Sequence, residues 1–369
     1  MALALAPDTS PNGTLPPFAD RLLAWWDAHG RKDLPWQQPR TPYRVWISEI
    51  MLQQTQVATV IPYFERWLQD FPDIEALAAA PLDAVLAHWS GLGYYARARN
   101  LHQAARICAE RYDGRLPNEA DALAALPGIG PSTANAIVSQ ATDTPAAVLD
   151  GNVRRVLARH AGIDGWPGRS AVQKRLWAEA EARLPAARGA DYTQAVMDLG
   201  ALLCHRSNPA CPQCPVRGDC RAALEGRVDE LPTPKPATKV GERALRMLIL
   251  RDEQGRVLLE RRPPAGIWGG LWCLPDGDGL ADIEARLGLR ADGPLELPAF
   301  EHRLSHLRLS IRPVFADARD AGQVHYSASC GWFDRAQQQQ LGLPRPVADL
   351  LRRLHDGEFN PAATKEDRE

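Results

Sequence analysis

The chain has 369 residues, of which 45% are hydrophobic and 24% are charged, and its formal net charge at pH 7 is −2. This length accommodates two or three domains with sizeable cores, and the composition is that of a globular protein. The small net charge excludes a global basic field, so binding to nucleic acid would need local basic patches. No apolar run approaches the roughly 18 residues of a membrane span. Residues 1–17 lack a secretory signal pattern and predict a mobile tail on a cytosolic protein without membrane contact.

The first folded segments have the apolar spacing of helices. An amphipathic helix is predicted over Phe18–His29, and a mostly apolar one over Pro42–Gln54. Glu49 lies within the second helix, one turn from large apolar side chains. A carboxyl group in such surroundings resists ionisation, so its pKa should rise toward the value that a general acid needs. The alternative is a carboxylate that reaches solvent or pairs with Arg44.

Two loops have side chains suited to nucleic acid. Gln53–Gln56 is a polar stretch whose amide groups could read base edges, although it could equally be an exposed helix end. Gly91–Asn100 combines two glycines with Tyr94, Arg97 and Arg99. This pattern suits a loop that inserts an aromatic ring between stacked bases while its arginines contact phosphates. It also suits a turn with one core tyrosine, followed by a solvated basic helix.

A glycine-rich turn joins two further predicted helices. Apolar residues favour helices over Glu119–Leu126 and Thr133–Ser139, and Pro127 ends the first of them. Gly128 and Gly130 then permit backbone angles that are closed to other residues. Such a hairpin directs several backbone N–H groups at one point beside a helix N-terminus, which makes an anion site suited to phosphate. An ordinary helical hairpin is the alternative.

Asp150 opens the next predicted helix. The segment carries Arg154, Arg155 and Arg159, and it has no acidic residue between Gly151 and Arg159. As a helix N-cap, Asp150 needs no further explanation. Beside a turn that grips phosphate, its carboxylate could also stabilise a cation formed from bound nucleic acid. Apolar helices are predicted further on, so that nearly all of the first 225 residues are helical.

Four cysteines follow within 17 residues. Cys204, Cys211, Cys214 and Cys220 have the spacing C-x6-C-x2-C-x5-C. In a cytosolic protein, four thiols this close indicate a metal site rather than disulfides. Zinc and a [4Fe–4S] cluster both use four cysteines, and the composition does not choose between them.

The pattern changes after a proline-rich segment at residues 227–241, which predicts a linker. Beyond it, short β-like runs alternate with short helices, which predicts a small α+β domain over residues 242–358 and a mobile tail over 359–369. The predicted strands are Leu245–Leu250, Arg256–Leu259, Leu307–Ala316 and His325–Phe333, and the predicted helices are Asp282–Leu287 and Val347–His355.

Taken together, these residues resemble the helix-hairpin-helix DNA glycosylases, and adenine DNA glycosylases of the MutY type in particular. The resemblance extends over nearly the whole chain. Its segments are Leu34-Pro35-Trp36, Trp46–Thr55, Gly91–Asn100, Leu126–Ala134, Leu149–Arg155 and the cysteine loop. It implies a mainly α glycosylase region over 18–226, with the hairpin and an iron–sulfur loop, followed by a Nudix-like domain. It also implies the hydrolytic removal of adenine mispaired with 8-oxoguanine or guanine in duplex DNA, by a monomer.

The resemblance assigns roles to several residues. Glu49 would protonate N7 of the departing purine, Asp150 would stabilise the oxocarbenium-like sugar, and Asn152 would support the reacting groups. Tyr94 would be the wedge beside the oxidised guanine, and Gln54 would fill the gap that the flipped base leaves. Further DNA contacts are implied for Arg97, Arg99, Gly128 and Gly130, and a [4Fe–4S] cluster rather than zinc for the cysteines.

Three departures from related patterns carry further expectations. Enzymes of the wider superfamily that also cut the backbone have a lysine where this chain has Ser132, so we expect a monofunctional enzyme in which Ser132 lines the adenine pocket. The Nudix-like domain lacks the paired glutamates of a pyrophosphohydrolase, since its helix carries only Asp282 and Glu284 as acids. The 8-oxoguanine loop, Phe-Ser-His in the family, reads Leu304, Ser305 and His306 here, without the aromatic ring.

Two other functions fit parts of the pattern. An endonuclease III-like glycosylase for oxidised pyrimidines would share the hairpin and the cysteines, but Ser132 and the second domain argue against it. A non-catalytic iron–sulfur protein that binds DNA would need neither Glu49 nor Asp150.

Overall fold

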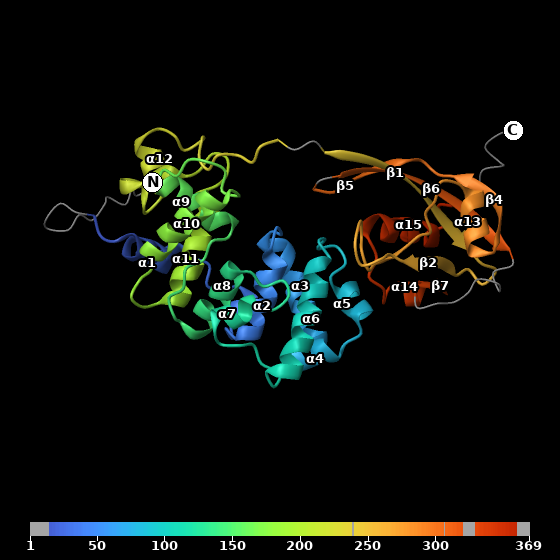
Figure 1. Cartoon of the computed structure of the whole chain (residues 1–369), viewed down its shortest axis with the longest axis horizontal. Helices are drawn as coiled ribbons and strands as arrows, with labels where there is room; N and C mark the ends of the chain where they lie inside the picture. The colour runs from blue at the N-terminus through green and yellow to red at the C-terminus, as the bar shows by residue number, and fades with distance from the viewer. Residues whose placement is uncertain (1–14, 238–239, 306, 320–328, 360–369) are drawn as a thin grey trace. The chain divides into compact units, whose positions relative to one another are not determined.

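The computed structural model describes residues 15–237, 240–305, 307–319 and 329–359, which pack as two compact units (Figure 1). The first unit takes in the described chain up to Ala78 together with Gln103–Ala237, and the second takes in Ala79–His102 and the described residues from Val240 onward. The predicted tails lie outside the described residues, apart from Leu15–Pro17 and Phe359. In the described part of the chain, no helix is long and apolar enough to cross a bilayer.

The first unit is helical, as predicted. Its elements are α1 (Phe18–His29), η1 (Pro35–Gln37), α2 (Pro42–Leu52), α3 (Val57–Asp70), α4 (Ile74–Ala79), α7 (Ala120–Ala124), α8 (Pro131–Thr142), α9 (Gly151–His160), α10 (Ser170–Ala182), α11 (Gly189–Leu202), η2 (Cys211–Gln213), η3 (Arg217–Asp219) and α12 (Arg221–Leu224). Helix α6 (Ala96–Arg111) runs from the second unit into the first. Local signals begin several of these helices. The Thr41 side chain caps α2, and Pro131 occupies the first position of α8, where its missing N–H leaves no hydrogen bond unmade.

Helix α11 packs against both α8 and α9 in the first unit, and α2 packs on α8. Gly200 of α11 allows the close approach of α9, because a Cβ at this position would lie 2.6 Å from the Cβ of Asn152. The core between α1, α9, α10 and α11 is apolar and includes Leu22, Val153 and Leu199. Packing therefore fixes where α9 begins, and with it the position of Asp150.

A buried carboxylate ties α1 to α11. Asp198 is fully buried and accepts hydrogen bonds from the Arg31 guanidinium at 2.8 and 2.5 Å and from the Arg31 backbone N–H at 2.8 Å. Trp26 Nε1 and Gln194 Nε2 donate to the same carboxylate at 3.2 and 2.8 Å. The charge is thus paired and its oxygens are satisfied, as burial of a carboxylate requires.

The second unit is built on one mixed sheet. Its elements are α5 (Leu82–His88), β1 (Gly241–Arg251), β2 (Val257–Arg261), β3 (Trp272–Cys273), α13 (Leu280–Leu287), β4 (Arg290–Glu296), β5 (Phe300–Arg303), β6 (Leu307–Arg319), β7 (Cys330–Phe333), α14 (Arg335–Gln338) and α15 (Arg345–His355). Among the described residues the order is β3-β2-β1-β6-β4, with β5 also on β6 and β7 also on β2. Strands β1 and β6 are parallel, with Gly241 opposite Leu307 and Arg251 opposite Asp317, and the other pairs are antiparallel.

Both faces of this sheet are covered. Along β1, Met247 and Ile249 enter the apolar cluster shared with α15, whereas Leu248 and Leu250 enter the one shared with α13. A strand buried on both faces reads as a continuous apolar run, which is why β1 was predictable from sequence. The predicted α+β domain is confirmed. Strands β3, β4 and β5 were missed, because they are short or have mixed burial.

One grouping was not indicated by the sequence pattern. Ala79–His102 packs with the C-terminal residues rather than with the rest of the helical region. Tyr95 Oη donates to the Leu343 carbonyl at 2.9 Å, Asp83 forms an ion pair with Arg261, and Arg99 Nη1 donates to the Gly269 carbonyl. The segment that carries Tyr94 is therefore attached to the α+β domain.

Candidate active site and cysteine cavity

Glu49 lies on the side of α2 that packs against α8. Gln140 of α8 donates from Nε2 to Glu49 Oε1 at 3.1 Å. The pKa of Glu49 is raised to about 7, mainly by burial and also by the nearby Asp150 carboxylate, while the Gln140 hydrogen bond lowers it. The carboxyl group does not pair with Arg44, whose guanidinium donates to the Pro35 carbonyl at 2.6 Å. The Glu49 side chain is half-buried against α8, which is closer to the predicted apolar environment than to a fully solvent-exposed carboxylate.

Asp150 is the N-cap of α9, and its Oδ1 accepts the Val153 N–H at 2.7 Å. Burial raises the pKa of Asp150, while the Val153 N–H and the nearby Arg155 lower it. The Glu49 carboxyl group accepts a hydrogen bond from a neutral amide, whereas the Asp150 carboxylate caps a helix N-terminus and has cationic neighbours. Burial raises the pKa of both carboxyl groups, but only Asp150 combines hydrogen bonds with neighbouring positive charges that lower its pKa. The structure thus brings the two predicted carboxylates into one site and gives them unequal surroundings.

Two side chains of α8 hold the extended segment that leads to Asp150. Ser132 Oγ accepts the Leu149 N–H at 2.9 Å, and Asn135 Nδ2 donates to the Ala147 carbonyl at 2.6 Å. Ser132 thus acts on the backbone beside Asp150, and its place in an adenine pocket stays a prediction. Asn135 and Gln140 were missed. Their sequence signal is the presence of polar residues on the core-facing side of an otherwise apolar helix.

The hairpin between α7 and α8 differs in one respect from the prediction. Gly128 has φ +79, a left-handed conformation that favours glycine, as expected. Gly130 has φ −91 and ψ 171, which any residue adopts, so the expectation of special backbone angles is wrong at this position. A Cβ at Gly130 would also meet no atom within 4 Å among the described residues. Neither the backbone conformation nor the internal packing requires glycine at position 130. The space that its side chain would occupy is open and lies at the first turn of α8.

Asn152 and Arg155 connect this site to the cysteine loop. Arg155 Nη2 donates to Asn152 Oδ1 and to the Gly200 carbonyl, both at 2.8 Å, and its Nε donates to the Cys204 carbonyl at 2.7 Å. One turn further along α9, Arg159 Nη1 approaches Cys204 Sγ at 3.3 Å. Helix α9 therefore contacts the first cysteine with the same face that begins next to Asp150.

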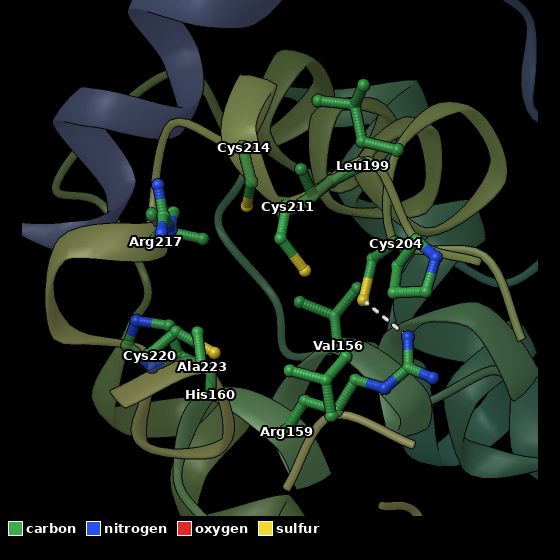
Figure 2. Close-up of a pocket in the computed structure, with 14 residues that line it drawn as sticks. Val156, Arg159, His160, Leu199, Cys204, Cys211, Cys214, Arg217, Cys220 and Ala223 are labelled. Atoms are coloured by element: carbon green, nitrogen blue, oxygen red, sulfur yellow. Dashed lines mark hydrogen bonds between the residues drawn. The ribbon is translucent and has the colours of Figure 1, made fainter. Parts of the chain in front are cut away.

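The four cysteines surround one cavity. Their side chains point into it from different sides, with Arg159 beside Cys204 (Figure 2). The cavity has a volume of about 430 Å³, part of it open to solvent, and apolar residues such as Val156 and Leu199 complete its lining. Among the described residues, no three His, Cys, Asp or Glu side chains surround a point closely enough for a single metal ion.

The four cysteine sulfur atoms that line this cavity are suitable ligands for a cluster with cationic metal atoms. Burial raises the pKa of the Cys214 thiol to about 12, so four neighbouring thiolates need positive charge among them. The loop itself is held from outside the cavity. Asp219, next to Cys220, accepts hydrogen bonds from Arg21 at 2.7 Å and from His160 at 3.1 Å. The four sulfurs are thus presented by a loop fixed to α1 and α9.

Two of the residues predicted to contact DNA have left-handed backbone conformations. Gln54 has φ 61 and is exposed, and Tyr94 has φ 50 with 48% of its surface exposed. Non-glycine residues with such angles are uncommon and concentrate at functional sites. Arg97 stacks on Trp89 and on Tyr94 and donates to the Gly93 carbonyl at 3.1 Å. Arg97 therefore shapes the loop, and Arg99 binds the Gly269 carbonyl, so phosphate contacts by either arginine stay predictions.

The predicted 8-oxoguanine loop connects β5 to β6. The Leu304 N–H donates to the Leu307 carbonyl at 2.8 Å, which places the exposed Ser305 in the connection, and His306 lies outside the described residues. The Leu304 side chain packs against the apolar cluster of the sheet. In α13, Glu284 Oε1 accepts the Ala291 N–H at 2.7 Å, so this carboxylate holds the start of β4.

Comparison with known proteins identifies both parts of the chain. Residues 47–182 match the HhH-GPD superfamily of base excision DNA repair proteins, and residues 246–353 match the NUDIX domain. The adenine DNA glycosylase of Buchnera aphidicola subsp. Baizongia pistaciae is 36% identical over 341 residues, which cover 91% of this chain and 96% of that protein. The adenine DNA glycosylase of Homo sapiens is 44% identical over 223 residues, covering 58% and 41%.

The fold of the first unit also has a solved counterpart. The structure of a thermostable thymine-DNA glycosylase superposes with a TM-score of 0.52 at 28% identity and covers 56% of this chain and 95% of that one. The matches in sequence run through both units and through the segments that carry Glu49, Asp150 and the β-sheet. The chain therefore belongs to the adenine DNA glycosylase family of the HhH-GPD base excision repair superfamily.

Proposed function

We propose that the enzyme removes adenine mispaired with 8-oxoguanine or guanine in duplex DNA, and that it cuts only the N-glycosidic bond. The observation that carries this proposal is the pair of carboxyl groups in unequal surroundings. Glu49 is half-buried beside a neutral amide, and desolvation raises its pKa to about 7, whereas Asp150 sits at the N-terminus of α9 near Arg155. One acid and one anion are the two groups that hydrolysis of a glycosidic bond requires.

In this proposal the target adenine leaves the base stack, at a cost of about a few kcal/mol, and enters the site. The neutral Glu49 gives its proton to N7 and makes adenine a better leaving group. The Asp150 carboxylate then stabilises the cationic sugar that forms as the bond to adenine breaks, and water completes the hydrolysis. Asn152, held by Arg155 at 2.8 Å, keeps the start of α9 in place beside Asp150.

The absence of lyase activity follows from Ser132. A lyase forms an imine between an amine of the enzyme and the opened sugar, and a hydroxyl group cannot form one. Here the Ser132 hydroxyl also accepts the Leu149 N–H at 2.9 Å, so it serves the backbone beside Asp150. We therefore expect an abasic site as the product, without a strand break.

The four cysteines are proposed to hold one [4Fe–4S] cluster. Proteins of this family are generally iron–sulfur proteins. A single zinc ion would need all four sulfurs within about 2.3 Å of one point. Cys204, Cys211, Cys214 and Cys220 instead line one cavity from several sides, and among the described residues they do not converge on one point as the ligands of a single ion would. When bound, the cluster would supply the positive charge that lets the thiolates stay together, and we assign it a structural role.

The hairpin and the two exposed loops are each proposed to contact DNA. Gly128 and Gly130 lie in the turn before α8, and Tyr94 and Gln54 supply the wedge and the gap-filling residue. The β5–β6 connection with Leu304, Ser305 and His306 is proposed to recognise 8-oxoguanine, through the serine and histidine rather than through an aromatic ring. We further propose that the enzyme acts as a monomer, in which the linker at 227–241 joins the glycosylase region at 18–226 to the domain at 242–358, with Ala79–His102 of that region packed in the second unit.

The two hairpin glycines give a matched test of DNA contact. Gly128→Ala places a side chain at φ +79, so we expect a loss of stability of about 1 kcal/mol. Gly130→Ala is expected to leave the melting temperature unchanged, because its Cβ meets no described atom within 4 Å. If a phosphate occupies that space, the same Cβ should weaken binding of duplex DNA by roughly tenfold. Unchanged DNA affinity of Gly130→Ala at equal stability would place the phosphate elsewhere.

The proposed function is tested by single-turnover assays on matched duplexes. One has adenine opposite 8-oxoguanine, one has adenine opposite guanine, one has adenine opposite thymine, and one has an oxidised pyrimidine. We expect strand breaks at adenine in the two mispairs, and only after alkali. Breaks without alkali would contradict the monofunctional mechanism, and breaks only at the pyrimidine would favour the endonuclease III-like function. No product from a cluster-loaded preparation that binds DNA would favour the non-catalytic one.

A further inference from the structure

Gln140 is a buried amide in the middle of the hairpin's second helix. Its residue surface is 3% exposed, and its Nε2 donates to Glu49 Oε1 at 3.1 Å. Its own Oε1 is buried without a hydrogen-bond partner among the described residues. The neighbouring Ser139 faces the other way and accepts a hydrogen bond from Thr193 of α11 at 2.9 Å. The amide of Gln140 is therefore directed at one group of the site, the carboxyl of Glu49.

A contribution to the stability of α8 does not explain why an amide side chain occupies position 140. A buried carbonyl oxygen without a partner lowers stability, whereas an apolar side chain of the same length would fill the position without that cost. The hydrogen bond to Glu49 must therefore serve the carboxyl group rather than the helix. A glutamate on α2 has several rotatable bonds, and a donor fixed on the neighbouring helix restricts which of its rotamers is populated.

The bond also distinguishes the two carboxyl oxygens. Glu49 Oε1 accepts the Gln140 N–H, so the proton of the neutral carboxyl group resides on Oε2. We propose that Gln140 is a positioning residue for the general acid, which holds the Glu49 carboxyl in one orientation and keeps its transferable proton on Oε2. The inference rests on the proposed role of Glu49 as the acid that protonates adenine.

The charges around Glu49 are few, which makes its titration a usable readout. Helix α8 has no ionisable residue, and Glu65, Arg66 and Asp70 of α3 are exposed. On α2 itself, Arg44 is engaged by the Pro35 carbonyl. The charged group that acts on the pKa of Glu49 is Asp150, which raises it, whereas the Gln140 hydrogen bond lowers it. Loss of this amide should therefore move the titration of Glu49 to higher pH.

The test compares Gln140→Met and Gln140→Leu with Ser139→Ala in the full-length, cluster-loaded enzyme. Methionine keeps the length and unbranched shape of glutamine without a donor, and leucine is a second apolar replacement in case methionine disturbs packing. Ser139→Ala removes a buried hydrogen bond from the same helix without touching either carboxyl group. Single-turnover adenine release is measured as a function of pH, together with thermal unfolding and DNA affinity.

We expect the Gln140 variants to fold at least as stably as the wild type and to bind DNA equally well. Their rate should fall by roughly 10- to 100-fold, since a misplaced catalytic group costs this much, and the pH above which the rate declines should shift upward. Ser139→Ala should keep the wild-type pH dependence. A Gln140 variant with wild-type rate and pH dependence, or with a slower rate and an unshifted pH dependence, would overturn the proposal. Failure of the underlying function would look different, since the wild type itself would then release no adenine.

Discussion

Glu49→Gln is expected to abolish adenine release without loss of fold or of DNA binding. Removal of a general acid costs about 10²- to 10⁴-fold in rate, and glutamine has no proton to give to N7. The substitution preserves the shape of the side chain and the oxygen that accepts the Gln140 N–H at 3.1 Å. The measurement is the single-turnover rate on a duplex with adenine opposite 8-oxoguanine, with DNA affinity measured in parallel. A variant that retains more than about a tenth of the wild-type rate would exclude Glu49 as the acid.

The same variant is expected to be more stable than the wild type at alkaline pH. The pKa of Glu49 is raised by burial from 4.5 to about 7, so the folded state favours the neutral carboxyl group. The stabilisation from this group is complete below pH 4.5 and is lost as the pH rises through 7. Above pH 7 the wild type must keep a half-buried charge, whereas glutamine stays neutral, which corresponds to a difference of at most about 3 kcal/mol. Urea unfolding at pH 5 and pH 8 measures it, and equal stability of both proteins at pH 8 would contradict the buried environment.

Asp198→Ala is expected to destabilise the first unit by about 3 to 5 kcal/mol, the usual cost of breaking a buried ion pair. The fully buried carboxylate accepts hydrogen bonds from Arg31, Trp26 and Gln194. Alanine would leave these donors without their acceptor and leave a cavity between α1 and α11. The free energy of unfolding, measured by urea denaturation of the variant and the wild type, tests this expectation.

Asp27→Ala is the matched control for that substitution. Asp27 also pairs with an arginine, Arg188, at 2.6 Å, but the two side chains are 50% and 43% exposed. An exposed pair of this kind contributes about 0 to 1 kcal/mol. A loss of stability in Asp198→Ala no larger than that in Asp27→Ala would show that the buried network does not hold α1 on α11.

Helices and strands with a regular apolar pattern were predictable from the sequence. The first helix was predicted at Phe18–His29 and has these bounds in the structure, because its buried residues recur at helical spacing. Strand β1 was predictable in the same way from its apolar run. The attachment of Ala79–His102 to the second unit was not, because it depends on contacts such as Tyr95 with Leu343, residues far apart in the chain. Periodicity reports local structure and carries no information on such partners.

In the candidate site, too, some features were predictable from the residue pattern, whereas others depend on how the helices pack. A carboxyl group among large apolar residues indicated a raised pKa for Glu49, and the structure supplies the cause, burial beside Asp150. The cysteine set and the hairpin were predicted from the residue pattern, and the resemblance to a known family supplied the choice of an iron–sulfur cluster over zinc. Gln140 and Asn135 were missed, since a single polar residue in a helix gives no direction for its side chain until the packing of α8 is known. The glycine at position 130 was predicted for a conformational reason that the backbone does not support.

The chemical identity of the released product tests the central claim most directly. A duplex with adenine opposite 8-oxoguanine is incubated with the wild type and with Asp150→Asn, and the small molecules and the strands are analysed by mass spectrometry. Asparagine is a good helix N-cap, so α9 should keep its start at the Val153 N–H while the negative charge is removed. We predict free adenine and an intact strand with an abasic site from the wild type, and neither product from the variant. Free adenine at the wild-type rate from Asp150→Asn, or no adenine from the wild type, would contradict the account.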